Sequence, residues 1–184
     1  MSSLHCSMEQ LEAGLDHIKQ SPKDEGRLEH IVARPQEGER SVLEEGELDV
    51  EVGLVGDNWQ ARGNKKTDDG KAHPDKQINV MNARSAALVA GTQDRWALAG
   101  DQLYVDFDLS LENLPPGTRF SVGDAVLEVT PPPHRGCKKF VARFGHEAMR
   151  FVNSEAGCAL NLRGINARVV TAARVRVGDA VRKL

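Results

Sequence analysis

The second half of the chain alternates short runs of β-branched residues with glycine-aspartate turns. The string VGDAV occurs at 122–126 and again at 177–181, and VGD also stands at 55–57. Gly-Asp pairs suit tight reversals between strands. The strands do not alternate regularly with long helices. The pattern therefore favours a mainly β fold with small helices, of the α+β class, and a closed or nearly closed β-barrel over a doubly wound α/β sheet.

A helix is expected before this β-rich region. Ser7 can cap its N-terminus, Gln10 completes a capping box, and apolar residues follow at i, i+4 and i+7. The chain of 184 residues fits one domain. We therefore predict an N-terminal helical extension over residues 1–26 and one β-barrel domain over residues 27–184.

Local patterns predict the remaining elements. Strands are predicted over 27–35, 77–82 and 103–107, the last of them half-buried, and short helices over 83–91 and 146–157. Residues 40–59 pass from a charged stretch, for which a helix stays open, into a tight loop at 53–57. The polar segment 58–77 is predicted to be a long surface loop, and such loops are often functional or disordered.

Composition narrows the class of protein. No apolar run approaches the roughly 18 to 20 residues that cross a bilayer, and the first residues lack a basic leader and an apolar core. A cytoplasmic protein without a membrane partner is therefore expected. Residues 1–100 carry 12 Lys and Arg against 18 Asp and Glu, and residues 101–184 carry 12 against 9. This asymmetry is too mild to indicate nucleic-acid binding.

The cysteines and common motifs exclude several kinds of site. Cys6, Cys137 and Cys158 are odd in number and include no CxxC pair, which argues for free thiols rather than a disulfide framework or structural zinc. The six histidines show no HxH or HExxH spacing. GxGxxG, GxxxxGK[ST], GxSxG and DxDxDG are also missing, so nucleotide binding, serine hydrolysis and calcium binding lose their usual support.

One cysteine has an unusual setting, in the string TPPPHRGCKKF at 130–140. The prolines at 131–133 stop the preceding strand and stiffen the loop, which fixes where the following side chains point. Gly136 removes a side chain next to the sulfur of Cys137, so a ligand could come close.

The charges around this cysteine favour its ionised form. Between residues 134 and 151 there are five Lys and Arg side chains and one acid. Nearby cations favour thiolate over thiol, which makes Cys137 a better nucleophile or soft-metal ligand. An ordinary thiol in a basic loop is an equally open interpretation. Cys158 is predicted to be structural, in a turn that leads into a buried strand.

Several segments occur in an order that resembles one family. They read GLVGDNW, QINVMNARSAALVAG, LAGDQLYVDFDLSLENLPPGTRFSVGDAVLEVTPPPHRGCKKF and GINARVVTAARVRVGDAV. Together they resemble a MOSC domain, the module also found at the C-terminus of molybdenum cofactor sulfurases, over about residues 27–181. Each piece alone is weak. The order of a GxxGD loop, a strand-helix segment, a Gly-Asp turn, a β-hairpin and one cysteine after a proline-rich basic loop is fairly specific.

The resemblance implies a β-barrel of the MOSC type, similar to the pyruvate kinase barrel, in which Cys137 is the catalytic cysteine. Members are thought to bind the pyranopterin molybdenum cofactor with this thiolate near or on molybdenum, or to carry sulfur on it. Stand-alone bacterial members and the mitochondrial amidoxime-reducing component are associated with reduction of N-hydroxylated compounds. A molybdenum-dependent oxidoreductase, served by a redox partner, is therefore one expected class.

The cofactor is anionic through its phosphate and dithiolene, so nearby cations could form charge-assisted hydrogen bonds with it, each worth about 1.5–3 kcal/mol. Amides could bond the pterin ring, and two aspartates lie in loops that the family places near the pocket. The predicted cofactor-binding residues are His134, Arg135, Lys138, Lys139, Asn79, Asn82, Asp57 and Asp101. For the polar ones, an ordinary turn or strand-end hydrogen bond is equally open.

Two other functions stay open. In the first, Cys137 accepts persulfide sulfur from a separate, pyridoxal-phosphate-dependent cysteine desulfurase, because the chain has no recognisable desulfurase portion. In the second, the barrel is a non-catalytic interaction module. Two departures from the family pattern suggest it: Gly136 stands where many members have proline, and GDQL at 100–103 stands where many have Gly-Glu-Asn.

Overall fold

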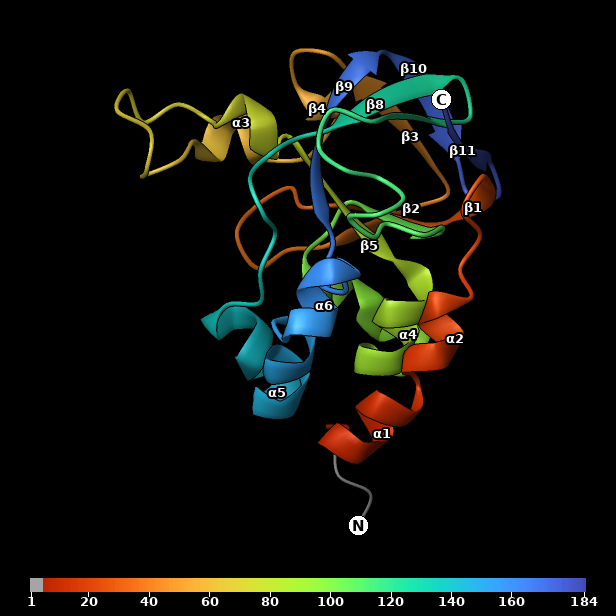
Figure 1. The fold of residues 1–184 in the computed structure, drawn as a ribbon. Coiled ribbons are helices and arrows are strands. Elements are labelled where there is room, and N and C mark those ends of the chain that lie inside the picture. Colours follow the sequence, from red (N-terminus) through yellow and green to blue (C-terminus); the bar gives the residue numbers. More distant parts are fainter. Residues whose placement is uncertain (1–4) are drawn as a thin grey trace.

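Seven strands close into a barrel (Figure 1). The computed structural model describes residues 5–184. The order around the barrel is β1, β11, β7, β8, β9, β5 and β6, and β6 returns to pair with β1. The strands are β1 Glu25–Ala33, β5 Ile78–Asn82, β6 Leu103–Asp106, β7 Arg119–Val122, β8 Ala125–Val129, β9 Ile165–Thr171 and β11 Ala180–Lys183. β5 and β6 are parallel, and the other neighbours are antiparallel. The predicted β-barrel is confirmed.

The glycine-aspartate turns join strands as the sequence predicts. One turn connects β7 to β8 through Gly123, whose φ is 54°. The other leads from β10 (Ala173–Arg176) into β11 through Gly178, whose φ is 99°. Glycine adopts positive φ without steric cost, which explains its place in both turns. The predicted domain boundary stays a prediction, and β1 itself begins at Glu25.

Residues 41–54 form three short strands and their turns, so the helix left open for the charged part of this segment is wrong. β2 (Ser41–Leu43) extends the sheet beyond β1, and β3 (Glu45–Asp49) lies between β10 and β4 (Gly53–Leu54) in a separate three-stranded sheet. Along β3, Gly46 and Leu48 are buried and their neighbours are partly or fully exposed. This alternation buries one face of the strand, and pairing with β10 outweighs the local preference of its charged residues.

α1, α2, α4, α5 and α6 gather at one end of the barrel, whereas α3 projects sideways with the loop that follows it (Figure 1). The helices are α1 Met8–Ala13, α2 Leu15–Lys19, α3 Trp59–Arg62, η1 Pro74–Lys76, α4 Ala83–Ala90, η2 Gln93–Ala99, α5 Lys138–Val152 and α6 Glu155–Ala159. The capping box predicted for Ser7 and Gln10 is confirmed. The predicted N-terminal helix is interrupted at Gly14, between α1 and α2, where a Cβ would lie 2.5 Å from the Leu88 side chain of α4.

Two apolar cores hold these layers together. One fills the barrel and includes Leu28, Phe120 and Leu127. The other lies between the outer face of the barrel and the helices and includes Met81 and Tyr104. β6 is therefore buried on both faces and not half-buried as predicted, because α4 and η2 cover its outer face.

The chain after the prolines also differs from the prediction. α5 begins at Lys138, eight residues earlier than expected, and bends at Gly145, whose φ is 89°. Cys158 lies within α6 and not in a turn before a strand, and its Sγ donates to the Asn153 carbonyl. No helix within residues 5–184 combines the length and apolar character needed to cross a membrane.

Candidate functional site

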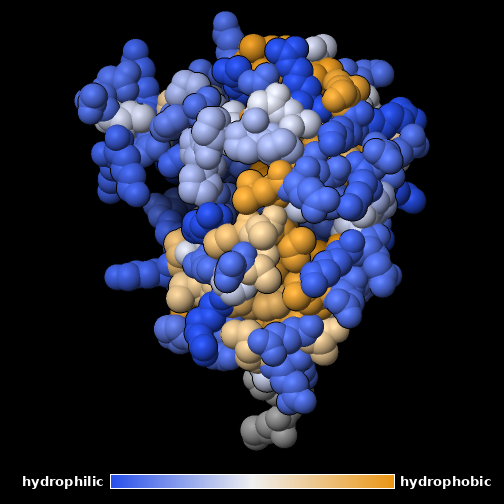
Figure 2. Space-filling view, viewed as in Figure 1, coloured by the Kyte–Doolittle hydropathy of each residue, from blue (hydrophilic) through white to orange (hydrophobic). Residues whose placement is uncertain are grey.

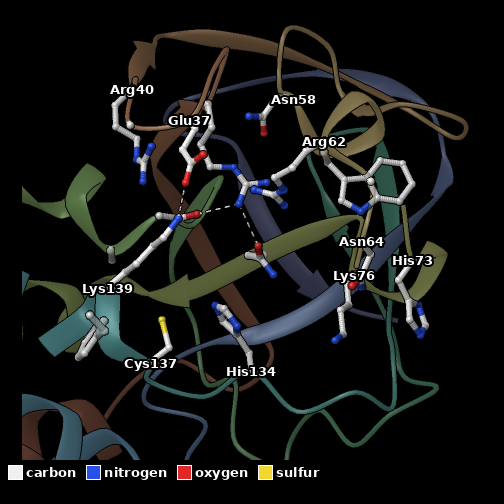
Figure 3. Close-up of a pocket in the computed structure, with 18 of the residues that line it drawn as sticks. Glu37, Arg40, Asn58, Arg62, Asn64, His73, Lys76, His134, Cys137 and Lys139 are labelled. Atoms are coloured by element: carbon white, nitrogen blue, oxygen red, sulfur yellow. Dashed lines mark hydrogen bonds and ion pairs between the residues drawn. The ribbon is translucent and has the colours of Figure 1, made fainter. Parts of the chain in front are cut away.

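A polar cavity of about 600 Å³ opens between the barrel, α3 and the start of α5 (Figure 3). Its walls come from the segment after β1, the α3 region, the residues before β5, the turn before β6 and the loop before α5. The charged and titratable residues that line it are Arg34, Glu37, Arg40, Arg62, Lys65, Lys66, His73, Lys76, His134, Cys137, Lys139, Arg143 and Arg163. Nine Lys and Arg side chains therefore face one carboxylate, so the cavity suits an anionic ligand.

Cys137 is exposed at the edge of this cavity and forms the N-cap position of α5. Asn153, which follows α5, forms two hydrogen bonds with Gly136, the residue before the cysteine. Gly136 N donates to Asn153 Oδ1 over 2.9 Å, and Asn153 Nδ2 donates to the Gly136 carbonyl over 3.2 Å. A proline at 136 would lack the first of these donors. The cysteine is therefore positioned by hydrogen bonds as well as by the prolines before it.

The buried carboxylate of Asp101 holds two residues that line the cavity. His134 Nε2 lies 3.0 Å from Asp101 Oδ1, and Arg163 Nη1 donates to Asp101 Oδ2 over 2.6 Å. The Asp101 side chain is fully buried and that of Arg163 is 8% exposed. The arginine also lies over the Phe140 ring, with 5.1 Å from Cζ to the ring centroid. These contacts fix the orientation of both cavity residues.

Charge and burial set the protonation states of Asp101 and His134. Burial raises the pKa of Asp101, but Arg163 and His134 outweigh it and lower that pKa to about 2. Burial lowers the pKa of His134, Arg163 lowers it further, and Asp101 opposes both. His134 is therefore neutral at pH 7, with Nε2 as the donor to Asp101 and Nδ1 as an acceptor.

We expect the free energy of unfolding to decrease as pH falls below about 6.5 and again below about 4. The unfolded chain binds protons at its ordinary histidine pKa of 6.5, whereas folded His134 resists protonation, as does His30 through burial. Asp101, whose pKa is about 2 in the folded protein, contributes to the second decrease. Urea unfolding across pH 3–8 checks this, and His134→Gln should flatten the first slope. An unchanged slope in that variant would contradict the assignment.

A second buried ion pair forms another wall. Arg34 Nε donates to Asp57 Oδ1 and Arg34 Nη2 to Asp57 Oδ2, both over 2.8 Å. The two side chains are 7% and 0% exposed. Arg34 Nη1 also donates to Asn79 Oδ1 and to the Gly100 carbonyl. Asp57 thus orients a cation toward the cavity without lining the cavity itself.

The structure brings some of the predicted site residues together and separates others. Cys137, His134, Lys139 and Asn79 line the cavity, Asp57 and Asp101 lie buried behind its wall, and Asn82, Arg135 and Lys138 lie outside it. Asn82 is the N-cap of α4, where its Oδ1 accepts from Arg84 N over 2.8 Å. Arg135 lines a shallow groove with the three prolines. Lys138 is exposed on the first turn of α5.

Sequence reasoning missed most of the cavity's cations, above all Arg34, Arg40, Arg62 and Arg163. Two of these carried a usable signal. Arg34 follows an apolar run at the end of a predicted strand, and Arg163 stands among leucines before a glycine. An arginine in such a setting is expected to be buried and to need a carboxylate partner. Arg40 and Arg62 lie in polar segments, where nothing distinguishes them from surface residues.

A closed mixed barrel with a basic cavity and a cysteine at its edge defines the class of protein. The family model described as "MOSC domain" matches residues 67–182. The chain therefore belongs to the MOSC domain family, as the sequence resemblance indicated. No curated protein matches the sequence.

Solved structures share the fold at low sequence identity. The YuaD protein from Bacillus subtilis has a TM-score of 0.59 and 16% identity, covering 85% of this chain and 94% of that one. A hypothetical protein has a TM-score of 0.61 and 16% identity, covering 88% and 69%. YiiM from Escherichia coli has a TM-score of 0.50 and 18% identity, covering 86% and 69%. At these identities the likeness shows the fold alone.

Proposed function

We propose that this protein binds the pyranopterin molybdenum cofactor, with the Cys137 thiolate as a ligand of molybdenum, and reduces N-hydroxylated compounds. The observation that carries the proposal is the cavity itself. It has a volume of about 600 Å³, nine cationic side chains against one carboxylate, and the cysteine at its edge. Cavities for ligands of this size span about 300–1,000 Å³, and a cationic lining suits an anionic cofactor.

Two unpaired atoms in the cavity wall also support a ligand with mixed polarity. Asn58 Oδ1 and Arg163 Nε are buried, and neither has a hydrogen-bond partner within residues 5–184. Leaving such a group unsatisfied costs about 1–3 kcal/mol. A pterin ring carries both donors and acceptors, so it suits a wall that offers an amide oxygen and a guanidinium N–H.

In this proposal, different residues bind different parts of the cofactor. Arg40, Lys139 and Arg143, near the cysteine, bind the cofactor phosphate, and Asn79 bonds the pterin. Within residues 5–184 there is no cluster of three or more His, Cys, Asp and Glu that could hold a metal ion. Cys137 is then the protein's ligand to a metal that arrives with the cofactor. The bound cofactor supplies two-electron transfer.

The proposed reaction converts an N-hydroxyl group to N–H and water with two electrons and two protons. A redox partner protein carrying reduced flavin or iron–sulfur supplies the electrons. The nitrogen–oxygen bond breaks, the oxygen takes up one proton and leaves as water, and the nitrogen takes up the other proton. His134 lies beside Cys137 at the cavity (Figure 3). Its Nδ1 can accept and pass on a proton while Asp101 holds Nε2.

Protein purified from a molybdenum-competent host should contain nearly stoichiometric molybdenum and pterin, and Cys137→Ser should lose most of the molybdenum. The serine hydroxyl is a poor ligand for a soft metal centre. Metal analysis and pterin fluorescence measure both components. Cys158→Ser is the matched control, because this thiol is half-buried in α6 and should leave the content unchanged. Wild-type protein without metal and without pterin would end the proposal.

The exposure of Cys137 also favours a second candidate, a sulfur carrier. Its thiolate would attack the outer sulfur of a cysteine desulfurase persulfide, so that the donor's sulfur–sulfur bond breaks and the donor thiolate leaves. Incubation with such a donor should then add about 32 Da to the intact mass, and the addition should be lost in Cys137→Ser. An unchanged mass would exclude this role.

A further inference from the structure

The cavity holds more unpaired positive charge than a single phosphate requires. Three of its nine cations lie within 4.0 Å of a carboxylate, in the pairs Arg34–Asp57, Lys139–Glu37 and Arg163–Asp101. The others have no such ion pair within the described residues: Arg40, Arg62, Lys65, Lys66, Lys76 and Arg143. Cations gathered around one cavity without ion pairs repel one another, and an anion bound among them would reduce this repulsion.

These six cations fall into two groups on different walls. Arg40 and Arg143 lie on the side of Cys137, and each is fixed by a main-chain carbonyl: Arg40 Nε donates to Ala97 O over 2.9 Å and Arg143 Nη1 to Leu98 O over 2.6 Å. The others belong to α3 and the residues up to β5. Figure 3 shows Lys76 on the wall opposite Arg40. The cavity thus has two separate basic ends.

The second group stands on a structured arm, residues 59–76, and not on a loose loop. Asn64 N donates to the Gly70 carbonyl, and Lys66 N donates to Asn64 Oδ1 over 2.9 Å. Thr67 Oγ1 closes the same turn by donating to the Asn64 carbonyl over 2.7 Å. Gly63, with φ 63°, allows the two sides of the turn to approach each other, since a Cβ there would lie 2.3 Å from Gly70 O. The lysines are therefore presented by a closed turn.

The arm has the surface of a binding element for a polar ligand. Figure 2 shows hydrophilic residues over the projecting α3 region, in contrast to the apolar residues that gather over the helical end of the molecule. Arg62, Lys65 and Lys66 also precede residue 67, where the family match begins. Burial lowers the pKa of Arg62, and repulsion by Arg34 lowers it further, although Asp57 and Glu37 oppose both effects. A bound anion would relieve this repulsion.

We propose that the arm is a second anion subsite, which binds a phosphoryl group other than the cofactor's own, and that the substrate is a phosphate monoester of an N-hydroxylated compound. The proposal rests on the proposed function, because the cations near Cys137 are assigned there to the cofactor phosphate. Lysine and arginine bind phosphate oxygens by charge-assisted hydrogen bonds, and several such groups on one wall fit a dianion. A cofactor that carries an additional nucleotide would place the same kind of phosphoryl group at the arm.

The test compares adenosine 5′-monophosphate with adenosine, a pair that differs only in the phosphate, by calorimetry on protein purified from a molybdenum-competent host. The monophosphate should bind at least about tenfold more tightly, because one charge-assisted contact is worth about that factor. The variant Lys65→Gln/Lys66→Gln/Lys76→Gln should lose the preference. Its charge-matched control, Lys19→Gln/Lys23→Gln/Lys183→Gln, changes lysines outside the cavity and should keep it.

Other outcomes separate the sources of the phosphoryl group. Equal binding of the two probes to wild type, or an unchanged preference in the arm variant, overturns the subsite. Nucleotide released by acid hydrolysis of the wild-type cofactor, and missing from the arm variant, assigns the subsite to the cofactor and overturns the substrate assignment. Molybdenum content is measured in parallel. If wild type lacks molybdenum and pterin but prefers the monophosphate, the proposed function fails and the anion subsite stands.

Discussion

Replacing Asp57 with asparagine is expected to lower the free energy of unfolding by about 3–5 kcal/mol, the usual cost of removing one partner of a buried ion pair. Arg34 would remain charged and 7% exposed, without a counter-ion. Its other acceptors, Asn79 Oδ1 and the Gly100 carbonyl, are neutral and cannot replace a carboxylate. Urea unfolding at pH 7 measures the loss.

Two further variants test the cause of this loss. Glu25→Gln removes a carboxylate of an exposed pair with Arg182 and should change stability little, since solvent screens such pairs. The double variant Asp57→Asn/Arg34→Met removes both buried charges and should recover part of the loss, because no buried charge is then left without a partner. A double variant less stable than Asp57→Asn alone would contradict the unpaired-charge explanation.

Asp101→Asn should have a comparable cost, about 3–5 kcal/mol, and should also disturb the cavity. This carboxylate is fully buried and holds both Arg163 and His134. Without it, the guanidinium is buried unpaired and the imidazole loses its charged partner, so molybdenum content is expected to fall together with stability. The decrease in stability between about pH 4 and pH 2 should also become smaller, because the carboxyl group whose pKa is about 2 is gone.

A matched substitution separates position from charge. Asp106→Asn breaks the pair with Arg84, whose side chains are 29% and 20% exposed, and lies away from the cavity. It should cost less stability than Asp101→Asn and should leave molybdenum content unchanged. Equal losses of molybdenum in both variants would show that general destabilisation, and not the local role of Asp101, explains the effect.

The barrel could be predicted because its signals are local. Glycine-aspartate turns, the capping box at Ser7 and the stop at the prolines all act within a few residues, so they are legible in one sequence. Asn82 carried a local signal too. It precedes an alanine-rich helix, the usual position of an N-cap, and the structure uses it there.

The cavity could not be predicted because its parts are far apart along the chain. Six of its nine cations belong to the first hundred residues, which are acidic overall, so the charge balance of each half pointed to the wrong part of the chain. Lys138 and Lys139 are neighbours in the sequence, yet Lys139 lines the cavity and Lys138 lies outside it. Which of them faces inward depends on where α5 begins, and the predicted helix began at residue 146.

The pairing of β1 with β11 has a consequence for how the protein is made. Glu25 and Arg182, 157 positions apart, are neighbours in the closed barrel. During translation β1 leaves the ribosome early and has no such partner until the last strand is synthesised. Contacts at this separation slow folding, and an unpaired strand edge can join another chain. We therefore expect nascent chains that stall before β11 to depend on chaperones.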